Sequence, residues 1–273
     1  MLRLALILVL AFAALPAAAQ ERRPSHCIAI AEATPGVQYA SLGEFTAPLD
    51  EFTVRLRYVD HSMFLIRAPG GLSAATDFTG FLGPTTFLPD VVTMNNAHST
   101  HWTPNPSPDI PHVLEGWARG GEPADHHLDL GEMLIRNVPT DVRSGFDGVR
   151  VAGNSIFVFE VAGLCIGHLG HLHHEPDEVQ YAALGRLDVV MAPVDGGMTL
   201  DLPTKIKTLK RLRSSVVIPM HWFSTVSLDR FTSGMADEFD IEVTDGSSYE
   251  VSLRTLPSRP TIVVLRPEFL DDE

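Results

Sequence analysis

Short runs that alternate apolar and polar residues dominate the chain, and they predict a protein built mainly of β-strands. Residues 53–59, Thr-Val-Arg-Leu-Arg-Tyr-Val, alternate with the period of two that is typical of a half-buried strand. The same reasoning predicts an amphipathic helix at 204–213, and further strands at 63–66, 90–94, 133–138, 154–161, 164–167, 188–192, 216–220 and 261–265. A strand meander followed by β–α–β alternation predicts two packed sheets with helices outside them.

The first 19 residues have the pattern of a secretory signal peptide. Met1-Leu2-Arg3 is followed by an apolar run from Leu4 to Leu15 and by Ala17-Ala18-Ala19. The alternative is a membrane anchor, but this run is shorter than the roughly 20 apolar residues that a spanning helix needs. We expect cleavage after Ala19, export to the bacterial periplasm or secretion, and no stable membrane anchor afterwards.

The remaining chain divides by composition. Residues 20–50 are irregular and form a predicted N-terminal arm, whereas residues 51–273 form one predicted domain. Within that domain, residues 103–130 are rich in Pro, Gly, Asp and His without periodicity, and we expect a surface insertion there.

Charge and motifs exclude several classes of function. The formal net charge of −14 disfavours nucleic-acid binding, because phosphates would be repelled. The chain has no GxGxxG, P-loop or GxSxG pattern, so neither a nucleotide cofactor nor a serine nucleophile is indicated. A small-molecule substrate or ligand is the expected partner. The two cysteines, Cys27 and Cys165, suit either one disulfide or two separate thiols, and the sequence leaves both open.

Histidines follow three of the predicted buried strands. They comprise His98 and His101 after 90–94, a group at 168–174 after 164–167, and His221 after 216–220. Strand ends converge on one edge of a sheet, and imidazole is a common ligand for zinc and similar ions. A single histidine after a strand is more often structural, but three such groups together indicate a metal site.

The same stretches, in the same order, resemble the metallo-β-lactamase superfamily, specifically its ascorbate-6-phosphate lactonase-like branch. The segments that carry the resemblance are His61–Ile66 with Thr76-Asp77, Pro89–Val92 with Asn95–His101, Gly153–His174, and Asp188–Val194 with Val216–His221. The resemblance implies an α+β fold, a four-layer αββα sandwich. It also implies hydrolysis of an ester, lactone or phosphodiester by a metal-bound water.

The signature that this family uses to bind metal is incomplete here. Where the family has HxHxDH, this chain has Asn96, His98, Thr100 and His101, so one histidine and the aspartate are missing. A bridging aspartate of the family falls on His171. After the family's "VPxY" stretch, only Asp141 could stand for the expected histidine.

The surviving imidazoles suffice for one ion. We therefore predict a single Zn²⁺, or a comparable divalent ion, held by three or four of His98, His101, His171 and His221. Asp77 is expected to orient a ligand histidine. Further candidates for supporting or compensating contacts are Asn96, Asp141, His174 and Asp195. If four imidazoles close the coordination sphere, the alternative is a non-catalytic periplasmic protein that binds a metal or small ligand; whether the protein is an enzyme stays open.

Overall fold

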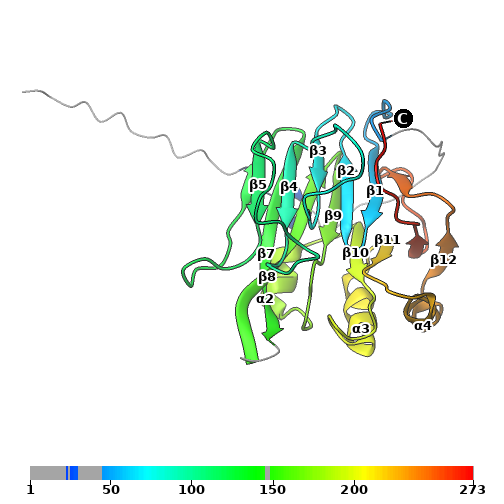
Figure 1. Ribbon diagram of the computed structural model, residues 1–273. Helices are drawn as coiled ribbons and strands as arrows, with labels where there is room; N and C mark the ends of the chain where they lie inside the picture. Colours follow the sequence, from blue (N-terminus) through cyan, green and yellow to red (C-terminus); the bar gives the residue numbers. More distant parts are fainter. Residues whose placement is uncertain (1–22, 24, 30–44, 145–147, 273) are drawn as a thin grey trace, which may run out of the picture.

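Two mixed β-sheets pack face to face in the computed structural model, which describes residues 23, 25–29, 45–144 and 148–272 (Figure 1). The six-stranded sheet has the order β13-β1-β2-β3-β4-β5 and the eight-stranded sheet the order β12-β14-β11-β10-β9-β8-β7-β6. The predicted signal peptide and most of the predicted arm lie outside the described residues.

Each predicted strand and the predicted helix overlaps an observed element, but β7 and β8 each extend six residues beyond the predicted 133–138 and 154–161. The first sheet contains β1 (Val54–Asp60), β2 (Met63–Arg67), β3 (Ser73–Ala75), β4 (Val91–Met94), β5 (His112–Glu115) and β13 (Ser248–Val251). The second contains β6 (His127–Asp129), β7 (Met133–Ser144), β8 (Gly148–Val161), β9 (Leu164–His168), β10 (Val189–Pro193), β11 (Val216–Met220), β12 (Asp240–Val243) and β14 (Thr261–Val264). The helices are α1 (His26–Ala29), α2 (Glu178–Leu184), α3 (Leu202–Leu212) and α4 (Thr225–Met235).

The main core lies between the two sheets. Inward-facing residues such as Leu56, Phe64, Phe157 and Ile218 are fully buried there, as expected where strands present alternate side chains to a shared interior. The strands β9, β10 and β11 run parallel and are buried throughout, so they read as continuous apolar runs in the sequence.

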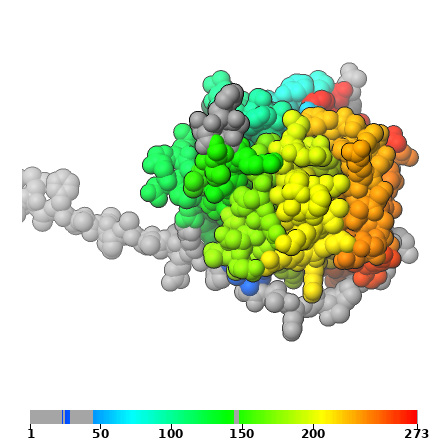
Figure 2. All heavy atoms as spheres, turned by 90° about the horizontal axis from the view of Figure 1, so that it is seen from below, coloured from blue at the N-terminus to red at the C-terminus, as the bar shows by residue number. Residues whose placement is uncertain are grey.

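The two outer faces are covered differently. Apolar residues of all four described helices pack on the outside of the eight-stranded sheet, and α2, α3 and α4 form much of the surface seen from below (Figure 2). The outer core of the six-stranded sheet is closed by loop residues, including Phe78, Leu82 and Ile110, together with Leu270 of the C-terminal tail. The α+β sandwich is therefore confirmed, with loops in place of helices over one sheet in the described part of the chain.

The stretch 103–130 is more ordered than its sequence predicts. It contributes β5, which extends the first sheet beside β4, and β6, which extends the second beside β7. The rings of Trp102 and Trp117 meet edge to face 5.6 Å apart at its base. These strands have three or four residues each, too few to show periodicity, so pairing with a neighbour determines them.

Cys27 and Cys165 form a disulfide that ties α1 to the buried strand β9, with their Cα atoms 5.8 Å apart. Next to it, the fully buried carboxylate of Glu160 accepts a hydrogen bond from Arg136 Nε at 2.8 Å and another from the backbone N–H of His26 at 3.0 Å. Within the described part of the chain, no helix combines the length and apolarity needed to cross a membrane.

Candidate metal centre

The carboxyl ends of three parallel strands position one half of the site. In the register of the sheet His168 pairs with Met191 and Pro193 with Met220, so β9, β10 and β11 end at the same edge. The loops that follow carry His171, Asp195 and His221. The ends of β9 and β11 thus lie at one edge as the sequence predicts, whereas β4, which the sequence predicts at the same edge, belongs to the other sheet.

The six-stranded sheet supplies the other half from its own parallel pair. Asp77 follows β3, and the loop with His98 and His101 follows β4. His61 lies in the turn between β1 and β2, and its carbonyl oxygen accepts a hydrogen bond from the backbone N–H of His221 at 2.7 Å. This bond joins the two halves of the site.

Six imidazole rings meet where these loops converge, and we call them the histidine cluster: His61, His98, His101, His171, His173 and His221. Neighbouring ring centroids lie 3.9 to 5.9 Å apart. Three members, His61, His101 and His221, each place a ring nitrogen within 4.8 Å of the other two. Such a separation lets three imidazoles share one ion with small side-chain adjustments.

A buried carboxylate fixes the orientation of His101. Oδ2 of Asp77 lies 2.5 Å from His101 Nδ1, and both side chains are fully buried. Burial lowers the pKa of His101 well below its usual value, so at neutral pH it is a neutral imidazole with its proton on Nδ1. Its Nε2 is buried without a hydrogen-bond partner among the described residues, and the same is true of Nε2 of His61.

Asp195 has the corresponding position beside His221. Its Oδ2 lies 3.0 Å from His221 Nδ1, and its Oδ1 accepts hydrogen bonds from the backbone N–H groups of Gly197 and Met198 at 2.8 and 2.9 Å. Burial alone would raise the pKa of Asp195, but the contact with His221 and the positive charge of Lys205 lower it overall. Asp195 is therefore an anion that both orders its own loop and faces a cluster histidine.

Four members of the cluster, His61, His101, His171 and His173, have a lowered pKa and are uncharged near neutral pH. Burial, and then the neighbouring imidazoles, lower the pKa of His61 to about 4 and that of His171 to about 2. Burial and Arg143 lower the pKa of His173 to about 4. Neutral imidazoles have the lone pairs that a metal ion requires.

The predicted ligands are not equally placed. His101 and His221 belong to the close group of three, whereas His98 and His171 pack beside it and His98 is exposed. His61 completes the close group; the sequence showed it only as part of a hairpin, although it too follows a strand. The ligand set therefore stays a prediction, with His61 as an added candidate.

Some of the supporting residues predicted from sequence contact the histidine cluster, and others do not. Asp77, Asp195 and Asn96 touch cluster histidines, Asn96 through its Nδ2 at 3.3 Å from His171 Nδ1. Asp141 accepts instead from the backbone N–H of Ala152 at 2.8 Å, and its own backbone N–H donates to Nε2 of His174 at 3.1 Å. Asp141 and His174 therefore satisfy backbone groups of β7 and β8 rather than the cluster.

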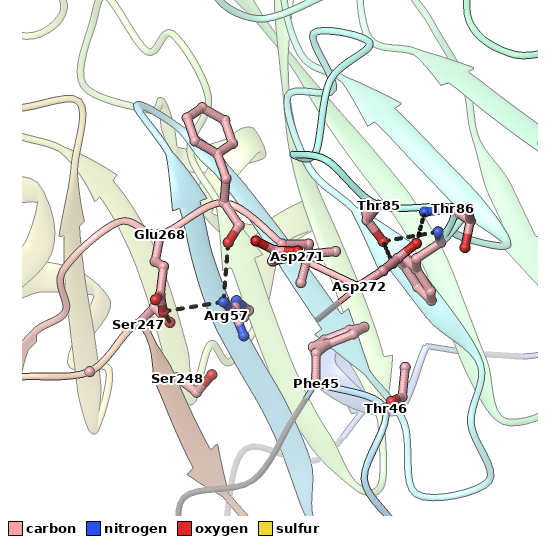
Figure 3. A pocket seen from close by; sticks show the side chains of 14 residues that line it. Phe45, Thr46, Arg57, Thr85, Thr86, Ser247, Ser248, Glu268, Asp271 and Asp272 are labelled. Carbon is pink, nitrogen blue, oxygen red and sulfur yellow. Dashed lines mark hydrogen bonds and ion pairs between the residues drawn. The ribbon is translucent and has the colours of Figure 1, made fainter.

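A cavity of about 830 Å³ lies elsewhere, under the C-terminal tail (Figure 3). Arg57 Nη2 donates to Glu268 across it at 3.2 Å, and the carboxylate of Asp272 accepts from the backbone N–H of Thr86 at 2.7 Å. No member of the histidine cluster lines this cavity. Its volume alone does not make it a site for the chemistry that the histidines indicate.

Comparison with known proteins agrees with this arrangement. Residues 55–221, more than half of the chain, match the family described as "Beta-lactamase superfamily domain". The chain belongs to the metallo-β-lactamase superfamily. The comparison does not establish the lactonase-like branch.

Relatives within the superfamily carry the names of metal-dependent hydrolases. The UPF0173 metal-dependent hydrolase TV0864 of Thermoplasma volcanium is 32% identical over 89 residues, which span 32% of this chain and 39% of that protein. Among solved structures, a candidate Zn-dependent hydrolase of the metallo-β-lactamase superfamily from Thermotoga maritima has a TM-score of 0.52 at 22% identity, covering 78% of this chain and 98% of that one. Igni18, a metallo hydrolase from Ignicoccus hospitalis, has a TM-score of 0.50 at 20% identity, covering 68% and 91%. At these identities the structures show a shared fold.

Proposed function

We propose that this protein is a metal-dependent hydrolase whose centre holds one divalent cation on His61, His101 and His221. The observation that carries the proposal is the close group of three imidazole nitrogens within 4.8 Å, two of them on residues whose Nε2 is buried without a partner in the described structure. A buried polar atom without a partner destabilises the fold, and a cation bound to Nε2 of His61 and Nε2 of His101 would give each atom a partner.

The donor set favours one ion, with zinc as the first candidate. Three neutral imidazoles match the ligands of hydrolytic zinc sites that keep one position open. A second ion would need further donors, usually carboxylates. Near the cluster, the described carboxylates Asp77 and Asp195 are already engaged with histidines and backbone N–H groups.

The cation would supply a Lewis acid that polarises a carbonyl or phosphoryl oxygen and makes a water molecule more acidic. The protein's own residues provide the rest. Asp77 holds the proton of His101 on Nδ1 and thus leaves the Nε2 lone pair for the ion. Phe223 is 62% exposed, with its ring 5.3 Å from the rings of both His61 and His221, and so offers an apolar wall to a bound substrate.

The substrate class in this proposal is a small ester, lactone or phosphodiester. The lactone within that class rests on the resemblance to the lactonase-like branch. The signal-like pattern of residues 1–19 supports a place of action in the periplasm or outside the cell.

A second candidate function is non-catalytic metal or ligand binding. It is favoured by the crowding of the cluster, since the rings of His98 and His171 lie 5.9 and 4.7 Å from that of His101. If either ring supplied a fourth ligand, no position would remain open for a substrate or water.

Metal analysis of the mature protein tests the metal site itself. After incubation with Zn²⁺ and removal of excess, we expect about one ion per wild-type chain, and fewer than about 0.2 in His101→Gln and in His221→Gln. His112→Gln, on β5 and outside the cluster, serves as the matched control and should keep its metal. Wild-type protein with fewer than about 0.2 ions per chain would refute the metal site.

Activity is then measured on a panel of esters, lactones and phosphodiesters. Turnover that is lost in His101→Gln and kept in His112→Gln supports the hydrolase. One bound ion with no turnover on the whole panel would favour the binding protein.

A further inference from the structure

We infer that His171 faces the centre as a hydrogen-bond donor through its Nε2–H, and is not one of the metal ligands. This inference rests on the proposed function, because it assigns a role within the same site. It comes from the direction of two hydrogen-bond relays that end on the other ring nitrogen of His171.

The first relay begins at Arg143. Its backbone N–H and its Nε–H both donate to Nδ1 of His173, at 3.1 and 3.3 Å. Backbone amides and guanidinium groups can only donate, so Nδ1 of His173 is an acceptor without a proton. The proton of His173 is therefore on Nε2, which lies 2.8 Å from Nδ1 of His171 and donates to it.

The second relay begins at Arg150. Its Nη2 donates to Oδ1 of Asn96, which fixes the orientation of that amide, because the nitrogen end of Asn96 could not accept from a guanidinium. Nδ2 of Asn96 consequently points to His171, 3.3 Å from the same Nδ1. Two separate donors thus meet Nδ1 of His171, each with its direction fixed by an arginine.

An imidazole nitrogen that accepts from two donors cannot carry a proton. The proton of His171 must then be on Nε2, where it occupies the lone pair that a metal ion would need. The two nitrogens of the ring point in widely different directions, so Nε2 points away from His173 and Asn96. The backbone of His171 is held as well, because its N–H donates to Oδ1 of Asn154 at 2.8 Å.

This geometry agrees with the position of His171 relative to the other rings. Its centroid is 4.7 Å from that of His101 and 5.5 Å from that of His221, yet it does not belong to the group of three whose nitrogens lie within 4.8 Å. An N–H beside the centre, aimed at an oxygen that gains negative charge during attack on an ester or phosphodiester, would stabilise that charge. His171 is therefore assigned as a catalytic donor, and Asn96 and His173 as positioning residues.

Nitrogen NMR on protein labelled with ¹⁵N-histidine tests the protonation directly and needs no activity. The His171 signals are assigned by their loss in His171→Gln. We expect a proton coupled to Nε2 and none coupled to Nδ1, both in metal-free protein and after addition of Zn²⁺ alone. A proton on Nδ1 in the metal-free state, or loss of the Nε2 proton on adding Zn²⁺, would overturn the inference.

Variants of the relays test the positioning role. Asn96→Ala and His173→Ala each leave one donor, so the proton of His171 should stay on Nε2. The double variant Asn96→Asp with His173→Ala replaces both donors by an acceptor and should move the proton to Nδ1. An unchanged position in that double variant, with wild-type circular dichroism, would show that the relays do not set the tautomer.

Metal affinity and kinetics give the second readout. For His171→Gln we expect the Kd for Zn²⁺ to change less than about threefold, whereas His221→Gln should weaken it more than about 100-fold. On a substrate found in the panel, His171→Ala should lower kcat about 100-fold or more with KM within about threefold. A Kd that rises in His171→Gln as much as in His221→Gln would make His171 a ligand. If wild-type protein binds no metal, the proposed function fails while the NMR result still decides the tautomer.

Discussion

Replacing Asp77 by Asn tests whether a buried carboxylate sets the protonation of a ligand histidine. Asp77 Oδ1 accepts from the backbone N–H of Asn95 at 3.0 Å, and Oδ2 faces His101 Nδ1 at 2.5 Å. The amide oxygen of Asn can keep the first bond. Its NH₂ group would then face Nδ1 of His101. The amide NH₂ and the Nδ1–H of His101 are both hydrogen-bond donors, so they cannot bond to each other. His101 would move its proton to Nε2 and lose the lone pair that faces the cluster.

The size of the effect follows from the role of the carboxylate as a partner of a ligand. Loss of such a partner typically weakens metal binding about 10- to 100-fold, or about 1.4–2.7 kcal/mol of binding free energy. The fold itself should tolerate the change. Asp77 has a positive φ of 44°, a conformation that Asn adopts as readily as Asp. Burial raises the pKa of Asp77 to about 6, so its removal also relieves a buried charge.

The assay is competition for Zn²⁺ against a chelator of known affinity, together with urea unfolding of metal-free protein. Asp90→Asn is the matched control, because that carboxylate binds the backbone N–H and hydroxyl of Ser73 at 2.8 Å and touches no cluster histidine. We expect weaker metal binding only in Asp77→Asn, with its urea midpoint close to that of wild type. A Zn²⁺ affinity within about threefold of wild type would refute the orienting role of Asp77.

Three further outcomes concern stability. Reducing the Cys27–Cys165 disulfide, which closes a loop with a sequence separation of 138, should lower the free energy of unfolding by about 2–5 kcal/mol, measured by urea denaturation with and without reductant. Glu160→Ala leaves Arg136 buried without its counterion and should cost about 3–5 kcal/mol in the same assay, whereas an unchanged midpoint would show that the pair is not coupled to folding. Metal-free protein should lose stability as the pH falls from 6.5 towards 4. In the folded protein His61, His171 and His173 have pKa values of about 2 to 4 and stay unprotonated over this range, whereas the same histidines bind protons in the unfolded chain, and this difference favours unfolding. Asp77, with its raised pKa of about 6, acts in the opposite direction over this range and offsets only part of that loss; urea midpoints measured at several pH values that rise on acidification would contradict the assignment.

Strands with long, clear periodicity were predictable from sequence, and short edge strands were not. The prediction for β11 at 216–220 is confirmed to the residue, and β1 and β10 lie within one residue of the predicted 53–59 and 188–192, whereas β8 begins six residues before the predicted 154–161. β3 and β5 have three and four residues, and their positions depend on hydrogen bonds to neighbours far along the chain. Local sequence cannot encode such pairing, because the partner's register decides it.

The candidate site was predictable as far as strand ends show it. His101 and His221 follow buried strands, but β4 and β11 belong to different sheets, so only the packing of the two sheets brings these histidines together. His61 ends a strand of the six-stranded sheet as well, and the same packing places it against His221. The directions of the hydrogen bonds around His171 depend on Arg143 and Arg150, and neither arginine is part of a recognisable motif.

Three of the seven non-glycine residues with positive φ in the described part of the chain belong to the proposed centre. His61, Asp77 and His221 have φ values of 44°, 44° and 57°, which side chains with a Cβ rarely adopt and which cost about 1–3 kcal/mol each. Such strain persists only where surrounding contacts hold it. Here the carbonyl of His61 accepts from both His221 N–H and the hydroxyl of Tyr58, the latter at 2.6 Å, and Asp77 is held through Asn95 and His101. These conformations turn two imidazoles and the carboxylate that orients a third towards one point, as the proposed centre requires.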